Sequence, residues 1–199
     1  MTKSAKLIIR KSVLAQREQL APDLRVSHSA AITNRLLQLP EYRQANTVLG
    51  YMHFGTEFAS ELWVARVLAD GKRLVLPKVN RHTSRLELYR VDDLGSQLEA
   101  GLWGIREPIV ERCERLNSLN EVEFALLPGV AFARNGARLG YGGGFYDKLL
   151  ALDGICGAQR PALVAAAFAL QIVAEIPQES TDIRVEWIVT EQETIACSI

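Results

Sequence analysis

The chain has 199 residues, of which 48% are hydrophobic, and its 23 lysines and arginines balance its 23 aspartates and glutamates. This size allows a sizeable core, so we expect a single domain over residues 1–199. The balanced charge excludes a general electrostatic attraction to nucleic acid or to an anionic membrane, so any anion must be bound locally.

Cysteine usage and hydropathy indicate the compartment. Cys113, Cys156 and Cys197 are odd in number and far apart, which is typical of reduced thiols and not of a zinc site or a disulfide scaffold. The N-terminal segment lacks the apolar stretch of a secretory signal. The longest apolar run, residues 161–170, is about half of the ~20 residues that a membrane span needs. We expect a soluble, cytoplasmic protein, and a monomer.

Two helices are predicted at the N-terminus. Residues 3–20 carry apolar side chains at roughly helical spacing between basic ones, which indicates a basic amphipathic helix. A second helix is predicted from residue 22 to residue 38, because the following Leu39-Pro40 disfavours helical backbone. We expect the pair to form an α-hairpin before the first strand.

The remaining elements alternate between strands and helices. Residues 47–54 are rich in strand formers, Ser60 is predicted to cap a helix through Ala69 that ends before Gly71, and residues 74–77 form a buried strand. Further strands are predicted at residues 86–91, 124–127, 163–168 and 187–190, and helices at 145–152 and 170–175. This order predicts a three-layer α/β/α domain with an open, mostly parallel sheet of Rossmann-like topology. Residues 92–120 form the longest connection.

A glycine cluster lies between a predicted strand and a predicted helix. Gly140, Gly142, Gly143 and Gly144 allow positive φ and close approach of backbone N–H groups to an anion, and the helix N-terminus adds positive potential. A tight turn would explain the glycines alone. Two flanking residues, Arg138 and Asp147, favour a phosphate site, because the first can grip phosphate oxygens and the second can hold a metal ion. The spacing matches neither a P-loop nor a Rossmann fingerprint.

Several segments in the same order resemble the 5-formyltetrahydrofolate cyclo-ligase family. The most specific resemblance is in residues 127–132 and 136–147, which read LPGVAF and GARLGYGGGFYD. Shorter matches are Ala5-Lys6 with Arg10, residues 54–57 (FGTE), 76–79 (LPKV), 103–108 (WGIREP), Ile176-Pro177 and Thr181-Asp182. The resemblance extends over most of the chain.

This resemblance implies an ATP- and Mg²⁺-dependent cyclisation of 5-formyltetrahydrofolate to 5,10-methenyltetrahydrofolate, with release of ADP and phosphate. It implies that Lys6, Arg138 and Tyr146 act in catalysis. The implied ATP site consists of Lys6, Arg10, Arg138, Leu139, Gly140, Tyr141, Gly142, Gly143, Gly144, Phe145 and Tyr146. The implied folate site consists of Met52, Phe54, Glu57, Trp103, Tyr141, Gly142, Gly143, Gly144 and Phe145. Asp147 and Asp182 would hold Mg²⁺.

Two positions depart from the commonest family pattern. Thr181 stands where many members have histidine, and Gly143 stands where some carry lysine. The second departure removes a possible cationic phosphate contact, so Arg138 and Lys6 would have to replace it. Neither departure removes a carboxylate from the implied metal site.

Simpler explanations exist for the implied site residues. Lys6 and Arg10 share one helix face, which could be a solvated basic stripe. Glu57 could cap a helix or lie in an exposed turn, Asp182 could cap a turn, and Trp103 could fill the core.

Lys78, the histidines and the function itself have alternative interpretations. Lys78 could be a site cation or a surface residue. His28, His53 and His82 have no metal-ligand spacing, so we expect no zinc. The alternatives in function are a phosphate- or nucleotide-binding protein without cyclo-ligase activity, and an isomerase or transferase acting on a sugar phosphate or acyl-CoA.

Overall fold

The computed structural model describes residues 2–101, 104–152 and 160–198. Its centre is a sheet that has eight strands within these ranges. In spatial order they are β13 (Thr194–Ala196), β12 (Trp187–Val189), β10 (Ala162–Ala166), β7 (Phe124–Leu127), β1 (Thr47–Leu49), β2 (Arg73–Asn80), β3 (Arg85–Val91) and β6 (Glu114–Leu116). The pairs among β12, β10, β7, β1 and β2 are parallel, and antiparallel strands extend the sheet at both edges.

The parallel strands follow the flavodoxin-like order of doubly wound sheets. Taken in chain order as strands 1 to 5 they are β1, β2, β7, β10 and β12, and they lie in the order 2-1-3-4-5. The strand β1 therefore lies between β2 and β7. After β1 the chain forms β2 on one side of it and later forms β7 on the other side. Open sheets of this kind bind ligands beyond the carboxyl ends of the strands at such a reversal.

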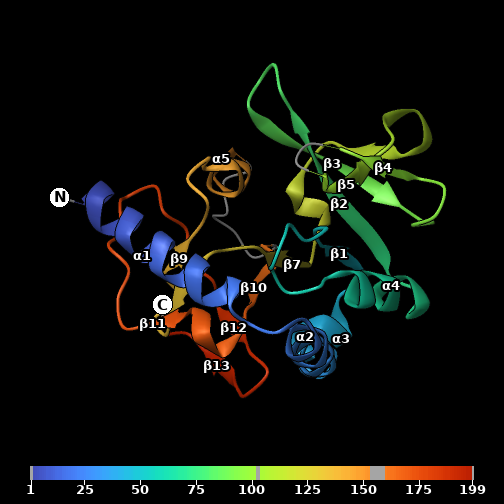
Figure 1. Cartoon of the computed structure of the whole chain (residues 1–199). Helices are drawn as coiled ribbons and strands as arrows, with labels where there is room; N and C mark the ends of the chain where they lie inside the picture. The colour runs from blue at the N-terminus through green and yellow to red at the C-terminus, as the bar shows by residue number, and fades with distance from the viewer. Residues whose placement is uncertain (1, 102–103, 153–159, 199) are drawn as a thin grey trace.

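Helices cover both faces of the sheet, which confirms the predicted three layers (Figure 1). On one face lie α2 (Pro22–Leu36), α3 (Pro40–Gln44) and α4 (Glu61–Ala69), and on the other lies α5 (Phe145–Leu152). The faces follow from strand alternation, because Val48 packs in the core beneath α4 whereas Leu49 packs in the core that contains Leu150 of α5. Strands that are buried on both faces need the nearly continuous apolar sequences seen here.

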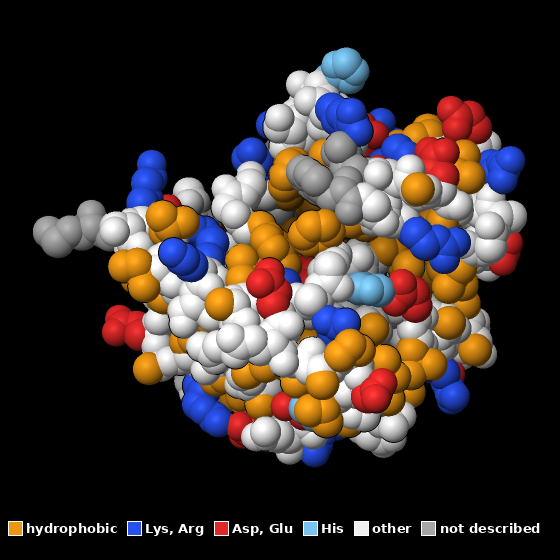
Figure 2. All heavy atoms as spheres, in the orientation of Figure 1, with side chains coloured by type: hydrophobic (Ala, Val, Ile, Leu, Met, Phe, Trp, Pro, Cys, Tyr) orange, Lys and Arg blue, Asp and Glu red, His pale blue; other side chains and the backbone are white. Residues whose placement is uncertain are grey.

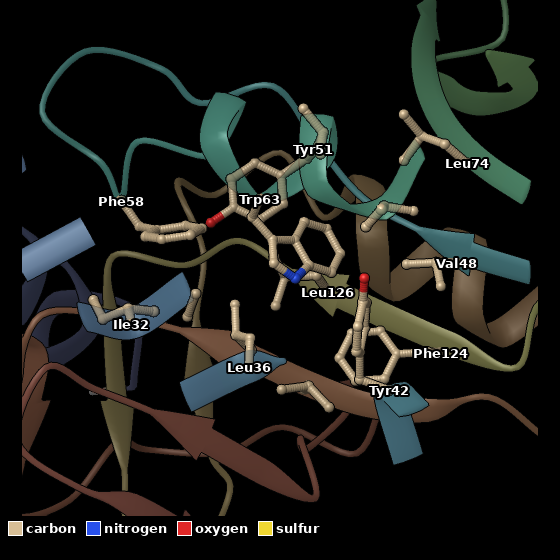
Figure 3. Packing of buried hydrophobic residues seen from close by; sticks show 14 of the residues in the cluster. Ile32, Leu36, Tyr42, Val48, Tyr51, Phe58, Trp63, Leu74, Phe124 and Leu126 are labelled. Carbon is tan, nitrogen blue, oxygen red and sulfur yellow. The ribbon is translucent and has the colours of Figure 1, made fainter. Parts of the chain in front are cut away.

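Trp63 of α4 lies at the centre of the larger core (Figure 3). Its ring centroid lies 6.2 Å from that of Tyr42 and 6.0 Å from that of Phe124, and Tyr42 meets Phe124 edge-on at 5.7 Å. Leu36 of α2 and Leu126 of β7 complete the surroundings (Figure 3). This cluster joins α2, α3 and α4 to the middle of the sheet.

The first helix does not form the predicted hairpin. The structure places α1 (Thr2–Glu18) against β8 (Ala131–Ala133) and η4 (Ala169–Gln171), while α2 packs on α4 and β12. The apolar face of α1 is buried through Val13, which packs in a small separate cluster with Leu139. This docking brings Lys6 to Asp182 and Arg10 to the carbonyl group of Gly140.

Most predicted elements are confirmed, and three details are wrong. The strand predicted at residues 47–54 ends at Leu49, and the N–H of Gly50 makes one further hydrogen bond, to Val75 of β2. The helix predicted at 170–175 is the short turn η4 followed by β11 (Ile172–Val173), which pairs with β8. Ser60 precedes α4 as predicted, but its hydroxyl accepts the N–H of His53 and makes no cap hydrogen bond.

The long connection before β7 contains short elements of its own. These are β4 (Leu98–Ala100), β5 (Arg106–Pro108), η2 (Val110–Arg112), β6 and η3 (Leu119–Glu121). The hairpin of β4 and β5 lies beside β2. No helix among the described residues combines the length and the apolar character of a membrane span.

Replacing Trp63 tests the contribution of this core. Trp63→Ala is expected to lower the free energy of unfolding by about 3–5 kcal/mol, because it removes a fully buried aromatic side chain and leaves a cavity. The adjacent Leu62 is 56% exposed, so Leu62→Ala is the matched control and should change stability by less than about 0.5 kcal/mol. Urea unfolding measures both values. Equal losses for the two variants would contradict the assigned core.

Candidate active site

A cavity of about 550 Å³ opens beyond the carboxyl ends of β1 and β7, at the reversal in strand order. Figure 2 shows hydrophobic side chains gathered in the hollow between the part of the molecule that carries β2 to β5 and the part that carries α1 and α5. The lining residues are Tyr51, Met52, Phe54, Glu57, Leu76, Pro77, Val79, Leu86, Ile105, Arg106, Glu107, Pro128, Arg138, Gly140, Tyr141, Gly143, Gly144, Phe145, Tyr146 and Asp147. The cavity therefore has an apolar wall facing a glycine-rich, charged wall.

The glycine-rich wall is the segment between β9 (Arg138–Leu139) and α5. Gly142 and Gly144 have φ values of 109° and 63°, which side chains rarely permit. A β-carbon on Gly143 would lie 2.7 Å from the ring of Phe145, so that ring occupies the space beside the position where some family members carry lysine. These backbone conformations make the segment, hereafter the glycine loop, a compact lead into the N-terminus of α5.

Arg138 and Asp147 form an ion pair at the two ends of the glycine loop. Nη2 of Arg138 lies 2.6 Å from Oδ1 of Asp147, and Nη1 lies 3.3 Å from the carbonyl oxygen of Pro128. The Arg138 side chain is 3% exposed. The pair joins the end of β7, β9 and the first turn of α5, so it fixes the loop between them.

Two basic residues of α1 also reach the site. Nζ of Lys6 lies 2.6 Å from Oδ2 of Asp182, and Nε of Arg10 lies 2.7 Å from the carbonyl oxygen of Gly140. Lys6 is 8% exposed, so the alternative of a solvated basic stripe is wrong for this residue. The shared helix face predicted from their spacing is the face that α1 turns to the glycine loop.

The carboxylates of Asp147 and Asp182 lie in adjacent segments. Oδ1 of Asp147 accepts the N–H of Ile183 at 3.4 Å, and Oδ2 of Asp182 accepts the N–H of Glu179 at 2.8 Å. Burial raises the pKa of Asp182, but hydrogen bonds from Lys6 and Glu179 outweigh it and bring the pKa below its usual value. In the contacts found among the described residues, each carboxylate uses only one of its two oxygens. Oδ2 of Asp147 and Oδ1 of Asp182 make none of these contacts and could bind a ligand.

Those two remaining oxygens suit Mg²⁺. This ion prefers one or two carboxylates together with phosphate oxygens and water over a site made only of protein groups. The described residues contain no group of three or more metal-binding side chains. Of the histidines, His53 pairs with Glu61 at 2.8 Å and His28 lies 3.7 Å from Glu191.

Glu57 is a buried acceptor in the lining of the cavity. It is 5% exposed, and its Oε2 accepts the N–H of Phe54 at 2.8 Å. Burial raises the pKa of Glu57, although hydrogen bonds from Phe54 and Tyr141 and the charge of Arg17 counteract the increase. The carboxylate is buried and accepts a backbone N–H of its own turn, so the simpler explanation of an exposed acidic turn is wrong.

Aromatic and apolar residues surround this acceptor. Phe54 meets Tyr141 edge-on with ring centroids 6.1 Å apart, and Met52 is buried beside them. Burial and the charge of Glu57 raise the pKa of Tyr146, so its phenol stays protonated at neutral pH. Trp103, which the resemblance places in the folate site, lies outside the described residues.

The sequence did not identify several residues of the site. Arg17 is 2% exposed and donates to Tyr141 and Thr56, and its spacing from Lys6 and Arg10 along one helix face was the signal that could have revealed it. The apolar wall from β2 and β3 and the residues Arg106 and Glu107 of β5 were given no role, although residues 76–79 and 103–108 are among the family matches. Lys78 donates to the carbonyl oxygen of Pro108 at 2.7 Å and to Glu99, so it supports the β4–β5 hairpin.

Fold and site together define an α/β protein with a cavity that combines a glycine-rich loop with apolar and aromatic side chains. The comparisons with known proteins agree with this class. The model of the 5-formyltetrahydrofolate cyclo-ligase family matches residues 2–191. The chain belongs to that family.

Solved structures and curated relatives give the same result. The 5,10-methenyltetrahydrofolate synthetase of Aquifex aeolicus superposes with a TM-score of 0.82 at 32% identity, over 98% of this chain and 93% of that one. The 5-formyltetrahydrofolate cyclo-ligase of Escherichia coli is 28% identical over 175 residues, which cover 88% of this chain and 94% of that protein. The mouse 5-formyltetrahydrofolate cyclo-ligase is 25% identical over 194 residues, 94% of each chain.

The ion pair of Lys6 can be tested by stability. Asp182→Asn is expected to lower the free energy of unfolding by about 1–3 kcal/mol at pH 7, because it leaves the buried ammonium group without its carboxylate. Glu179→Gln is the control, since Glu179 lies 3.7 Å from the same ammonium group and is 46% exposed. Urea unfolding in the presence of EDTA removes any contribution from metal. A larger loss for Glu179→Gln would show that the pairing is assigned to the wrong carboxylate.

Proposed function

We propose that the chain converts 5-formyltetrahydrofolate to 5,10-methenyltetrahydrofolate with consumption of ATP, which becomes ADP and phosphate. The observation that carries this proposal is the cavity that the glycine loop lines together with the buried acceptor Glu57 and apolar side chains. The glycine loop suits the phosphate groups of a nucleoside triphosphate, and the buried acceptor Glu57 suits a pterin ring. The family to which the chain belongs supports the same reaction.

The chemistry explains the need for ATP. Closing the ring of 5-formyltetrahydrofolate removes the formyl oxygen, and hydroxide is a poor leaving group. In the proposed reaction the formyl oxygen attacks the γ-phosphorus, ADP leaves, and an N5-iminium phosphate forms. N10 then bonds to the formyl carbon, phosphate leaves with the oxygen, and N10 loses its proton. The protein contributes mainly by positioning and by neutralising charge.

The phosphate end of ATP is assigned to the glycine loop and the cations around it. Backbone N–H groups from Gly140 to Phe145 and the N-terminus of α5 are suited to phosphate oxygens. Lys6, Arg10 and Arg138 supply positive charge from α1 and β9. The remaining residues of the proposed ATP site are Leu139, Tyr141 and Tyr146.

Mg²⁺ is assigned to Asp147 and Asp182, through the oxygens that their ion pairs leave. When bound, the ion would neutralise phosphate charge next to the transferring group. Arg138 and Lys6 orient these carboxylates, and each ion pair leaves its carboxylate in a fixed position before any ligand arrives.

The folate is assigned to the wall formed by Met52, Phe54 and Glu57, facing Tyr141 and Phe145 of the glycine loop. An ionised carboxylate can accept the ring N–H and amino groups of a pterin. The neutral phenol of Tyr146, which lines the same cavity, is a hydrogen-bond donor for the formyl or phosphoryl oxygen.

The activity test is direct. Purified protein mixed with 5-formyltetrahydrofolate, ATP and MgCl₂ should develop the absorbance of the methenyl product, and omission of ATP should abolish it. A phosphate-binding protein that lacks this activity would bind ATP without forming product. Failure to form ATP-dependent product at any protein concentration would falsify the proposed reaction.

Arg138 is expected to act on ATP more than on folate. Arg138→Gln should weaken ATP binding by about tenfold or more, since charged hydrogen bonds contribute about 1.5–3 kcal/mol each, and change folate affinity much less. Arg134→Gln is the control, because Arg134 lies in the same segment but pairs with Glu193 on the surface. Titration calorimetry with each ligand measures both effects. Equal weakening of the two ligands would argue against a phosphate role.

Asp147 is expected to set the magnesium dependence. Asp147→Asn keeps the shape of the side chain but removes a negative ligand, so turnover should fall at least tenfold and half-maximal activity should need more Mg²⁺. The measurement is the initial rate against MgCl₂ concentration, with circular dichroism as the folding control. An unchanged magnesium titration would remove Asp147 from the proposed metal site.

A further inference from the structure

Arg17 is buried next to the proposed folate site but does not line the cavity. It extends from the C-terminal part of α1, two turns beyond Arg10. Its Nε donates to Oγ1 of Thr56 at 3.0 Å, and its Nη2 donates to the hydroxyl of Tyr141 at 2.7 Å. The guanidinium carbon also lies 5.9 Å from the centroid of the Tyr141 ring. One side chain therefore connects α1, the segment after β1 and the glycine loop.

The direction of these hydrogen bonds defines what Tyr141 can do. Because arginine only donates, the Tyr141 oxygen accepts from Arg17 and its own proton remains available. The Tyr141 hydroxyl lies within hydrogen-bonding reach of the Glu57 carboxylate. Glu57 thus has two hydrogen-bond donors, the Tyr141 hydroxyl and the N–H of Phe54.

We propose that Arg17 is a positioning residue for the folate reaction, which holds the Tyr141 hydroxyl against Glu57 and so joins the glycine loop to the folate acceptor. This inference rests on the proposed function. Tyr141 belongs to the loop assigned to phosphate and Glu57 to the wall assigned to the pterin. Arg17 donates to the Tyr141 hydroxyl, and its hydrogen bond to Thr56, the residue before Glu57, fixes the guanidinium group.

The charges around Glu57 support this role. The titratable groups that act on it are Tyr51, Tyr141, Tyr146, His53 and Arg17. The three tyrosines are neutral at physiological pH, because burial raises the pKa of each. Arg17 is the permanent positive charge among these groups, and it opposes the effect of burial on the pKa of Glu57. Loss of Arg17 therefore favours the protonated carboxyl, which is a poorer acceptor for pterin N–H groups.

The first test compares Arg17→Gln with Lys11→Gln. Both remove one positive charge from α1, but Lys11 is exposed. Arg17→Gln is expected to weaken binding of 5-formyltetrahydrofolate about tenfold at neutral pH, with Lys11→Gln within about twofold of wild type. Titration calorimetry measures the affinity for folate without turnover. If the protein bound folate but formed no product, the proposed function would be contradicted, and this inference could still be tested.

The pH profile separates this role from a purely structural one. Folate affinity should fall as the pH drops through the pKa of Glu57, and in Arg17→Gln the inflection should lie at higher pH than in wild type. Arg17→Lys keeps the charge but not the planar guanidinium group, so it should return the inflection toward the wild-type pH. Such a return would also show that the loss in Arg17→Gln is not caused by misfolding. The same inflection in wild type and Arg17→Gln would overturn the proposal.

The double variant Arg17→Gln/Tyr141→Phe tests the connection itself. If Arg17 acts through the Tyr141 hydroxyl, Tyr141→Phe should weaken folate binding alone and add little on top of Arg17→Gln. Losses that multiply, so that the double variant binds more weakly by the product of the two single effects, would show that the residues act independently and would overturn the proposal.

Discussion

The ion pair between Arg138 and Asp147 is the contact on which the site depends. It connects the end of β7, through the Pro128 carbonyl group, to the first turn of α5, and the glycine loop runs between its two members. Asp147 in turn accepts the N–H of Ile183. A glycine-rich segment has high conformational entropy when free, so its ends must be fixed if its N–H groups are to converge on an anion. The buried pair supplies that constraint, and it also sets the direction of a carboxylate suited to a metal ion.

The docking of α1 provides a second constraint, which explains why this helix departs from the expected hairpin. Its apolar face packs on β8 and η4, and its basic face then lies along the glycine loop and the segment that carries Asp182. Lys6, Arg10 and Arg17 each contact a different part of the site. Three cations placed on one rigid helix keep their mutual spacing, which loops would not guarantee. Neutral overall charge is thus compatible with a local group of cations at the site.

Sequence patterns predicted best the elements whose bounds depend on neighbouring residues in the chain. The strand at residues 124–127 and the helix at residues 145–152 have the predicted bounds, because an apolar run and a glycine boundary define them without help from distant residues. The helix predicted at 170–175 was wrong because pairing with β8 outweighs its weak helical pattern. The apolar wall from β2 and β3 comes from residues far from the glycine loop in sequence, and only the strand order brings them to it. Family resemblance placed Glu57, but not the buried Arg17 that acts on it.

The position of Glu57 shows how the two halves of the cavity depend on each other. A pterin acceptor must be shielded from water to bind selectively, yet burial favours the protonated carboxyl that accepts poorly. Donors from Phe54 and Tyr141 oppose this effect, and one of them belongs to the glycine loop. The acceptor is therefore best formed when the loop is in place, and the loop is held by Arg138 and by α1. In the proposed function, pterin recognition and phosphate binding would therefore depend on the same fixed segment, and the two substrates would meet in one cavity.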